Sequence, residues 1–286
     1  MKKLLFFVTF CLCVLFSNAQ VKNAYGQNVV RKVEVYLYNQ TEPYITIDFN
    51  YSNSLQLEEL YFVAPSTGKV LLKRDGDKLT RIDYDVNGNV RKDIKYYYTI
   101  LNNLIGKCII DNIGIQGNVL RNSYVYCYDE GNKLLSSDRS VFVRDRNEGF
   151  NELSDRYREV FLWNVDGIVY TTSEKGWQWK IGQKFDYPIL FKERTYNFDL
   201  KNNINIDLFL LYKEIGNFER LEQCTEWCGK HPSFLIEKDR GVYFDYTFNN
   251  ENGGVDLSDD RGKLLQMDVY NCDKRLEKTF KISYWE

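Results

Sequence analysis

The sequence has little of what several catalytic protein classes require. Its 286 residues include one histidine, four prolines and two methionines. A Ser-His-Asp or Cys-His catalytic set would have to use that one histidine, His231, and no Gly-x-Ser-x-Gly motif accompanies it. We therefore interpret His231 as a surface or capping residue and assign no catalytic residue.

An excess of charge of either sign is also missing. The chain has 38 Lys and Arg residues against 40 Asp and Glu residues, and its basic residues form no stripe or polybasic segment. Proteins that bind nucleic acid usually carry such a basic patch, so we expect no nucleic-acid partner. The acidic residues are too numerous for their spacing alone to identify a carboxylate pair of the kind that glycosidases use.

Long apolar runs are absent except near the N-terminus. Residues 4–16 form such a run, directly after Lys2 and Lys3. A positive start followed by an apolar run of this length is typical of a secretory signal peptide, and the run is too short to span a bilayer comfortably. We expect an exported protein whose mature chain contains no transmembrane helix.

Small residues after this run mark a cleavage site. They occupy the two positions that a signal peptidase reads and end at Ala19, so we predict cleavage between Ala19 and Gln20. Residues 1–19 are then the signal peptide, and residues 20–286, which contain no low-complexity linker, form a single β-rich domain. The expected location is the periplasm, the outer-membrane surface or the extracellular space.

The remaining composition favours β-strands. Aromatic residues make up 16% of the chain, led by 22 Tyr and 18 Phe, and these residues suit half-buried pleated surfaces. Apolar and polar residues alternate in short segments that end at turn-forming residues, which is the pattern of a strand with one buried face. The predicted strands cover residues 32–38, 44–49, 60–63, 69–74, 79–84, 242–248, 264–270 and 278–285.

A turn motif recurs at residues 84–90, 128–134, 163–169 and 259–264. In each copy Asp or Asn precedes a Gly, and the next strand begins on an aliphatic residue. The Asp or Asn side chain can fold onto the local backbone, while Gly adopts the positive φ that the turn needs. Recurring hairpins of this kind predict an antiparallel meander.

Two stretches depart from the alternation. Residues 151–161 have apolar residues close to helical spacing, and we expect either a short helix or a long loop there. Residues 207–227 carry apolar residues at spacings of three and four, which predicts one or two helical turns interrupted at Gly216 and Asn217.

Five cysteines remain after removal of the signal peptide. In an exported protein we expect disulfides, and the candidates are Cys108, Cys127, Cys224, Cys228 and Cys272. Spacing does not fix the pairing, because Cys224 can pair with Cys228 or with Cys272. These residues together with His231 have the ligand types of a zinc site, but a disulfide is the commoner outcome outside the cell, and we assign no metal site.

Trp177 and Trp179 are the best candidates for ligand binding. On a strand, residues two apart share one face, so the two indole rings would lie side by side. Such a pair could stack on a sugar ring or anchor a partner protein. The alternative is an aromatic pair that packs in the core.

The signal peptide, the composition and the aromatic-Asp-x-Asn-Gly turns resemble those of secreted Bacteroidetes proteins. Residues 203–208 and the late hairpins at residues 242–270 are similar to elements of a Bacteroidetes family of unknown function with a porin-like β-meander fold. The resemblance covers residues 30–285 and implies no known catalytic residue. The turn at residues 84–90 is also similar to the repeats of Rhs-type toxin shells, but the glycine spacing departs from a strict repeat.

These observations predict an all-β fold: an antiparallel meander with a strongly curved or partly closed, barrel-like sheet and a short helical insertion. We expect an exported, non-enzymatic protein that binds a glycan or an envelope protein and needs no cofactor. An integral outer-membrane β-barrel is the alternative hypothesis. Aromatic-rich alternating strands suit it, although 27% charged residues do not. A secreted hydrolase is the third and least favoured hypothesis.

Overall fold

The computed structural model describes residues 22, 27–64, 68–114, 117–144, 149–163, 169–176, 195–215, 219–232, 234–248 and 263–285. Within these residues the chain forms sixteen strands, one short α-helix and two 3-10 helices. The first nine strands are β1 (Val30–Leu37), β2 (Ile45–Tyr51), β3 (Leu57–Ala64), β4 (Gly68–Asp75), β5 (Lys78–Tyr84), β6 (Ile94–Leu101), β7 (Leu104–Ile113), β8 (Val119–Tyr128) and β9 (Leu134–Arg144). They are followed by β10 (Asn151–Trp163), β11 (Val169–Gly176), β12 (Thr195–Lys201), α2 (Leu208–Glu214), η1 (Leu221–Cys224), η2 (Glu226–Cys228), β13 (Phe234–Asp239), β14 (Val242–Phe248), β15 (Leu264–Tyr270) and β16 (Leu276–Tyr284).

The described strands form two antiparallel sheets. Ten strands pair in the order β12-β13-β14-β15-β16-β1-β2-β3-β4-β5. The last strand, β16, therefore pairs with the first, β1, in the middle of this sheet. Six strands pair in the order β11-β10-β9-β8-β7-β6. Apolar residues at alternate positions turn one face of each strand inward, as in β1, where Val33 and Val35 are buried while Glu34 between them is not.

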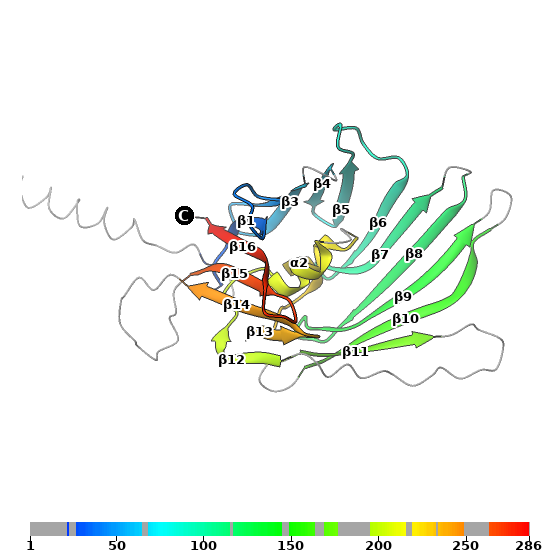
Figure 1. The fold of residues 1–286 in the computed structure, drawn as a ribbon. Coiled ribbons are helices and arrows are strands. Elements are labelled where there is room, and N and C mark those ends of the chain that lie inside the picture. Colours follow the sequence, from blue (N-terminus) through cyan, green and yellow to red (C-terminus); the bar gives the residue numbers. More distant parts are fainter. Residues whose placement is uncertain are drawn as a thin grey trace, which may run out of the picture.

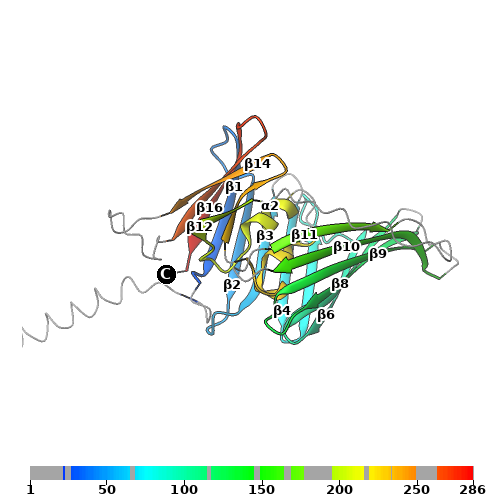
Figure 2. The ribbon, with the colours of Figure 1, turned by 90° about the horizontal axis from the view of Figure 1, so that it is seen from below.

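A helical segment lies between the two sheets (Figures 1 and 2). We use the name helical segment for the described part of residues 207–230, which contains α2, η1 and η2. Its buried apolar residues join those of both sheets in one hydrophobic cluster. We call the sheet faces that meet this segment the inner faces. Among the described residues, no helix has the length and apolar composition needed to cross a membrane.

The prediction of an antiparallel all-β meander with a short helical insertion at residues 207–227 is confirmed. The expected sheet shape is wrong, because the described strands form two open sheets, neither closed nor strongly curled. The edge strands are β12 and β5 in one sheet and β11 and β6 in the other. The inserted helical segment supplies the cover that closure of one sheet would otherwise have given.

The expectation for residues 151–161 is also wrong, because they belong to the long strand β10. This strand pairs with β9 on one side and with β11 on the other. Its register against β9 shifts between Leu153 and Arg156, and a bulge of this kind interrupts the alternation by which a strand is recognised. The shift lies within the stretch whose apolar spacing suggested a helix.

Two copies of the turn motif lie within the described residues; the first uses the expected chemistry, and the second differs in the residue that takes the positive φ. In the turn between β5 and β6, the Asp85 carboxylate accepts the backbone N–H groups of Asn87 and Asn89, both at 2.9 Å, and Gly88 has a φ of +82°. These hydrogen bonds lower the pKa of Asp85. In the turn between β8 and β9 the positive φ, +63°, falls on Asn132 and not on the preceding glycine.

Gly229 lets the helical segment contact this second turn. Its φ of +93° and ψ of −164° belong to a region that only glycine adopts readily. A Cβ atom at this position would lie 2.4 Å from the carbonyl oxygen of Asn132. That oxygen accepts the backbone N–H of Lys230 at 2.8 Å. The close approach therefore depends on a residue without a side chain.

We expect Gly229→Ala to lower the free energy of unfolding by at least about 2 kcal/mol more than Gly76→Ala, because strain and a backbone clash act together at Gly229. Gly76 also has a positive φ, +57°, but no atom lies within 4 Å of a Cβ there, so Gly76→Ala should cost only about 1–2 kcal/mol. Urea unfolding of both variants measures the difference, and equal losses would contradict the importance of this contact.

Candidate functional site

The helical segment is held together by its own caps. Asp207 accepts the backbone N–H of Leu210 at 2.9 Å and so caps α2, while its own N–H donates to the carbonyl of Cys224 at 2.8 Å. Thr225 caps η2 by accepting the N–H of Trp227 at 3.3 Å. Caps of this kind satisfy helix-end groups that would otherwise be buried without a partner. The segment can therefore enter the interior with its backbone groups satisfied.

Hydrogen bonds attach the segment to both sheets. On β3, the backbone N–H of Leu57 donates to the Glu226 carboxylate at 3.0 Å, and the Leu57 carbonyl accepts the indole N–H of Trp227 at 3.1 Å. On β8, the amide of Gln223 donates to the Tyr126 hydroxyl at 3.1 Å. The segment therefore ties the ten-stranded sheet to the six-stranded sheet.

A cluster of charged groups lies where the segment meets β5 and β6. Arg81, whose side chain is 1% exposed, donates from Nε and Nη2 to the two carboxylate oxygens of Asp83 at 2.8 and 3.3 Å. Its Nη1 donates to the carbonyl of Glu219 at 2.7 Å. Tyr96 donates to Asp83 at 3.0 Å, and its ring centroid lies 3.9 Å from the Arg81 guanidinium carbon. The buried Arg81 on β5 therefore connects this strand to β6 and to the helical segment.

Glu222 is the fully buried acid of this cluster. Its Oε2 lies 4.0 Å from Nη1 of Arg81 and accepts a hydrogen bond from the Tyr98 hydroxyl at 3.5 Å. Its Oε1 has no hydrogen-bond partner among the described residues. Burial raises the pKa of Glu222 to about 7, and the attraction of Arg81 offsets this only in part. The carboxyl group therefore changes its charge near neutral pH.

The chemistry of the cluster is that of proton binding within the core. Glu222 is completely buried, so it presents no surface to a substrate. Burial also raises the pKa of the neighbouring thiols of Cys108, Cys224 and Cys228, which are protonated and weakly nucleophilic as a result. These groups bind and orient the helical segment and have the properties of structural residues.

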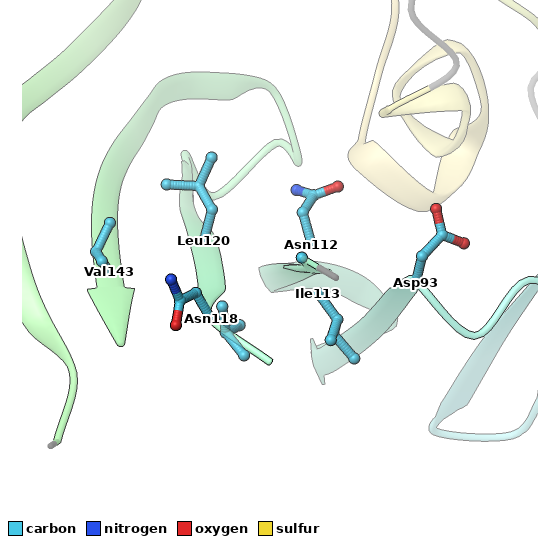
Figure 3. A pocket seen from close by; sticks show the side chains of 8 residues that line it. Asp93, Asn112, Ile113, Asn118, Leu120 and Val143 are labelled. Carbon is cyan, nitrogen blue, oxygen red and sulfur yellow. The ribbon is translucent and has the colours of Figure 1, made fainter. Parts of the chain in front are cut away.

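An open hollow of about 350 Å³ lies on the six-stranded sheet (Figure 3). Asn112, Leu120 and Val143 are directly opposite one another on β7, β8 and β9 and form a row across its floor. Asp93, which precedes β6, lines the same hollow, and its side chain points to the same side as those of Asn112 and Leu120. The remaining lining residues are Ile113, Gly114, Asn118 and Val119.

The floor of the hollow combines apolar side chains with the amide of Asn112, and Asp93 adds a carboxylate to its lining. Leu120 is 41% exposed, which is unusual for a leucine on a strand face that elsewhere is buried. The side-chain amide of Asn112 lies on the same floor and is half-buried. Asp93 forms an ion pair with Arg91. The hollow therefore offers an apolar surface beside an amide that is available to a ligand.

The tryptophans predicted to bind a ligand, Trp177 and Trp179, lie outside the described residues. The predicted cleavage site between Ala19 and Gln20 lies outside them as well. The hollow was not apparent from the sequence, because its three floor residues come from three strands and become neighbours only through the register of the sheet.

The expected disulfides are not present. The five candidate cysteines are all described, and each is a free thiol: Cys108, Cys224 and Cys228 are buried, and Cys127 and Cys272 are exposed. The thiol of Cys224 donates instead to the carbonyl of Leu221 at 2.9 Å. Because Cys272 lies at an exposed turn while Cys224 and Cys228 are enclosed by the core, the pairings with Cys272 are not formed.

The surface position expected for His231 is wrong. Its side chain is 7% exposed, and Nδ1 lies 3.8 Å from the carboxylate of Asp207. Burial lowers the pKa of His231, and Asp207 opposes this effect. Among the described residues, no group of three or more His, Cys, Asp or Glu side chains is arranged to hold a metal ion.

Comparison with known proteins identifies the fold. A porin-like protein from Bacteroides vulgatus ATCC 8482 superimposes with a TM-score of 0.51 at 12% sequence identity, over 90% of this chain and 98% of that chain. A porin-like protein from Bacteroides uniformis ATCC 8492 gives a TM-score of 0.45 at 11% identity over the same shares. The first of these matches confirms the predicted likeness to porin-like Bacteroides proteins for the fold.

Sequence comparisons add nothing to this likeness. No protein-family model matches the chain, and no curated protein matches it either. At 12% identity the structural match establishes a shared fold alone.

We expect Arg81→Met to lower the free energy of unfolding by about 3–5 kcal/mol, because it leaves Asp83 without a cation inside the core. Arg91→Met is the matched control, since Arg91 and Asp93 have the same spacing on the chain but side chains that are 41% and 55% exposed. An exposed pair contributes about 1 kcal/mol or less. Chemical unfolding measures both, and similar losses would contradict the central role of the buried pair.

Proposed function

We propose that this is an exported, non-enzymatic protein of the cell envelope that binds a glycan at the hollow on the six-stranded sheet. The observation that carries the proposal is the row of Asn112, Leu120 and Val143 across the floor of that hollow. A sugar ring has apolar faces and hydroxyl groups at its edge, so it needs an apolar surface beside hydrogen-bonding groups. The volume of about 350 Å³ is near the lower end of the range for small-molecule sites.

Binding without hydrolysis fits the acids at the hollow. Hydrolysis of a glycoside usually requires two carboxyl groups on opposite sides of the bond. Asp93 is the one acid among the residues that line the hollow, and it is paired with Arg91. Glu222, an acid whose pKa is raised by burial, lies in η1 and is fully buried, so it is not among the residues that line the hollow. These positions support recognition and do not favour the hypothesis of a secreted hydrolase.

The residues on the outer face of the ten-stranded sheet can be compared with those expected for the alternative hypothesis, an integral outer-membrane β-barrel. Such barrels turn apolar residues toward lipid and polar residues inward. Here the alternation has the opposite sense: on β1 and β2, Glu34 and Asp48 face away from the core, while Val35 and Ile47 are buried. This arrangement favours a protein with a hydrated outer face. The porin-like fold and the predicted signal peptide support a place in the cell envelope.

We expect Asn112→Ala and Leu120→Ser each to weaken binding of neutral saccharides about 5- to 30-fold, since each removes a contact of about 1–2 kcal/mol. Asn53→Ala and Leu265→Ser are matched controls, because both residues are exposed and belong to the ten-stranded sheet, Asn53 in the turn between β2 and β3 and Leu265 on β15. Isothermal titration with hits from a glycan array measures the affinities. Absence of saccharide binding at millimolar concentration, or equal losses in the controls, would contradict the glycan site, and turnover of a bound glycan would contradict a non-enzymatic role.

We also expect the mature protein to begin at Gln20 and to be found outside the cytoplasm. Mass spectrometry of the protein purified from fractionated cells measures both the N-terminus and the location. The variant Leu12→Arg places a charge in the apolar run and should retain the full-length chain in the cytoplasm. An uncleaved cytoplasmic protein in the wild type would contradict the proposed export.

A further inference from the structure

Glu222 is a buried titratable group that the proposed glycan site does not use. It lies in η1, on the side of the helical segment that meets β5 and β6. Its Oε1 is enclosed without a hydrogen-bond partner among the described residues. A buried carboxylate oxygen without a partner is costly, whereas a neutral carboxyl group is tolerated more easily in the same place.

The cations near Glu222 already have carboxylate partners. Arg81 is bound through two hydrogen bonds by Asp83, and Arg220 lies 3.7 Å from the carboxylate of Glu214. An ionised Glu222 would therefore add a negative charge to a cluster whose positive charges are matched. The titratable and charged groups that act on Glu222 come from the surrounding elements and are Arg81, Tyr96, Tyr98, Cys108, Tyr126, Tyr128, Glu214, Arg220, Cys224 and Cys228. Asp83 and Glu219 lie beside them as partners of Arg81.

We propose that Glu222 is a proton-controlled latch, which holds the helical segment against the inner sheet faces while its carboxyl group is neutral and weakens that docking when the group ionises. The geometry supports this because Glu222 is carried by the segment itself, whereas Arg81 and Tyr98 are carried by the sheets. When the segment detaches, Glu222 enters water and regains an ordinary acidity. The docked state therefore binds one proton that the detached state releases.

The direction of the pH effect follows from this difference. The pKa of Glu222 rises from 4.5 to about 7 on burial, so its contribution to docking is complete below pH 4.5 and is lost as the pH rises through about 7. His231 acts in the opposite direction, because its pKa is lowered by burial and its contribution is lost as the pH falls below 6.5. Comparison with Glu222→Gln at each pH separates the two effects.

The buried thiols of the segment provide the test. Cys224 and Cys228 are buried, so they can react with a disulfide reagent such as dithiodipyridine only when the segment leaves the sheets. Cys127 and Cys272 are exposed, so their labelling rates measure the intrinsic effect of pH on the reaction and are used to correct for it. We expect the corrected labelling rate of Cys224 and Cys228 in the full mature chain to rise at least about tenfold from pH 5 to pH 7.5 and to level off above pH 8. In Glu222→Gln the rise should be less than about twofold.

Glu237→Gln is the matched control, because Glu237 is an exposed glutamate on β13 and this variant should behave like the wild type. Hydrogen exchange of the wild type gives a second measurement that needs no substitution, with protection lost at residues 207–230 before it is lost in β1 to β4. A labelling rate independent of pH in the wild type would overturn the proposal. So would the same pH dependence in Glu222→Gln, or protection lost evenly over the whole chain.

Discussion

The described part of the structure depends on one constraint: two open antiparallel sheets must bury their inner faces, and the helical segment packs against both. An open sheet with an apolar face is stable only when another layer covers that face. Here the layer is the helical segment, whose Trp227 is fully buried and donates to the carbonyl of Leu57 on β3. The same segment contacts β8 through Gln223 and Tyr126. One hydrophobic cluster therefore contains residues of both sheets and of the segment. The polar groups that position the segment thereby determine how the two sheets pack against it.

Much of the fold could be predicted from the sequence because alternation reports burial directly. Strands such as β2, with Ile45, Ile47 and Phe49 buried, have one apolar residue at every second position, and the segment at residues 207–227 has helical spacing for the same reason. The register shift in β10 breaks this rule, so residues 151–161 were assigned wrongly. Sheet closure could not be predicted either, because alternation states which face is buried and does not state what covers it.

The charged cluster and the hollow illustrate what local patterns do not contain. Arg81 and Asp83 stand at inward positions of β5, and charged residues there signal a buried pair. Their partners on the segment lie more than 130 residues further along the chain, as the separation of 138 between Arg81 and Glu219 illustrates. His231 shows the same limit, since its side chain is buried beside Asp207, a residue 24 positions earlier in the chain. The cysteines suggested disulfides because export alone favours them, whereas in the fold all five are free thiols, three of them buried and two exposed.

One face of β8 links the two features that we assign to function. Leu120, Tyr124 and Tyr126 lie on this face at intervals of two or four residues; the first lines the hollow, and the last accepts a hydrogen bond from the segment. Six residues of strand separate Leu120 from Tyr126, or about 20 Å at the usual rise. Coupling between two sites requires an element whose arrangement both of them change. The strand between them is held on both sides by β7 and β9, so the proposed ligand site belongs to a rigid sheet and the proposed proton latch belongs to the segment that covers it.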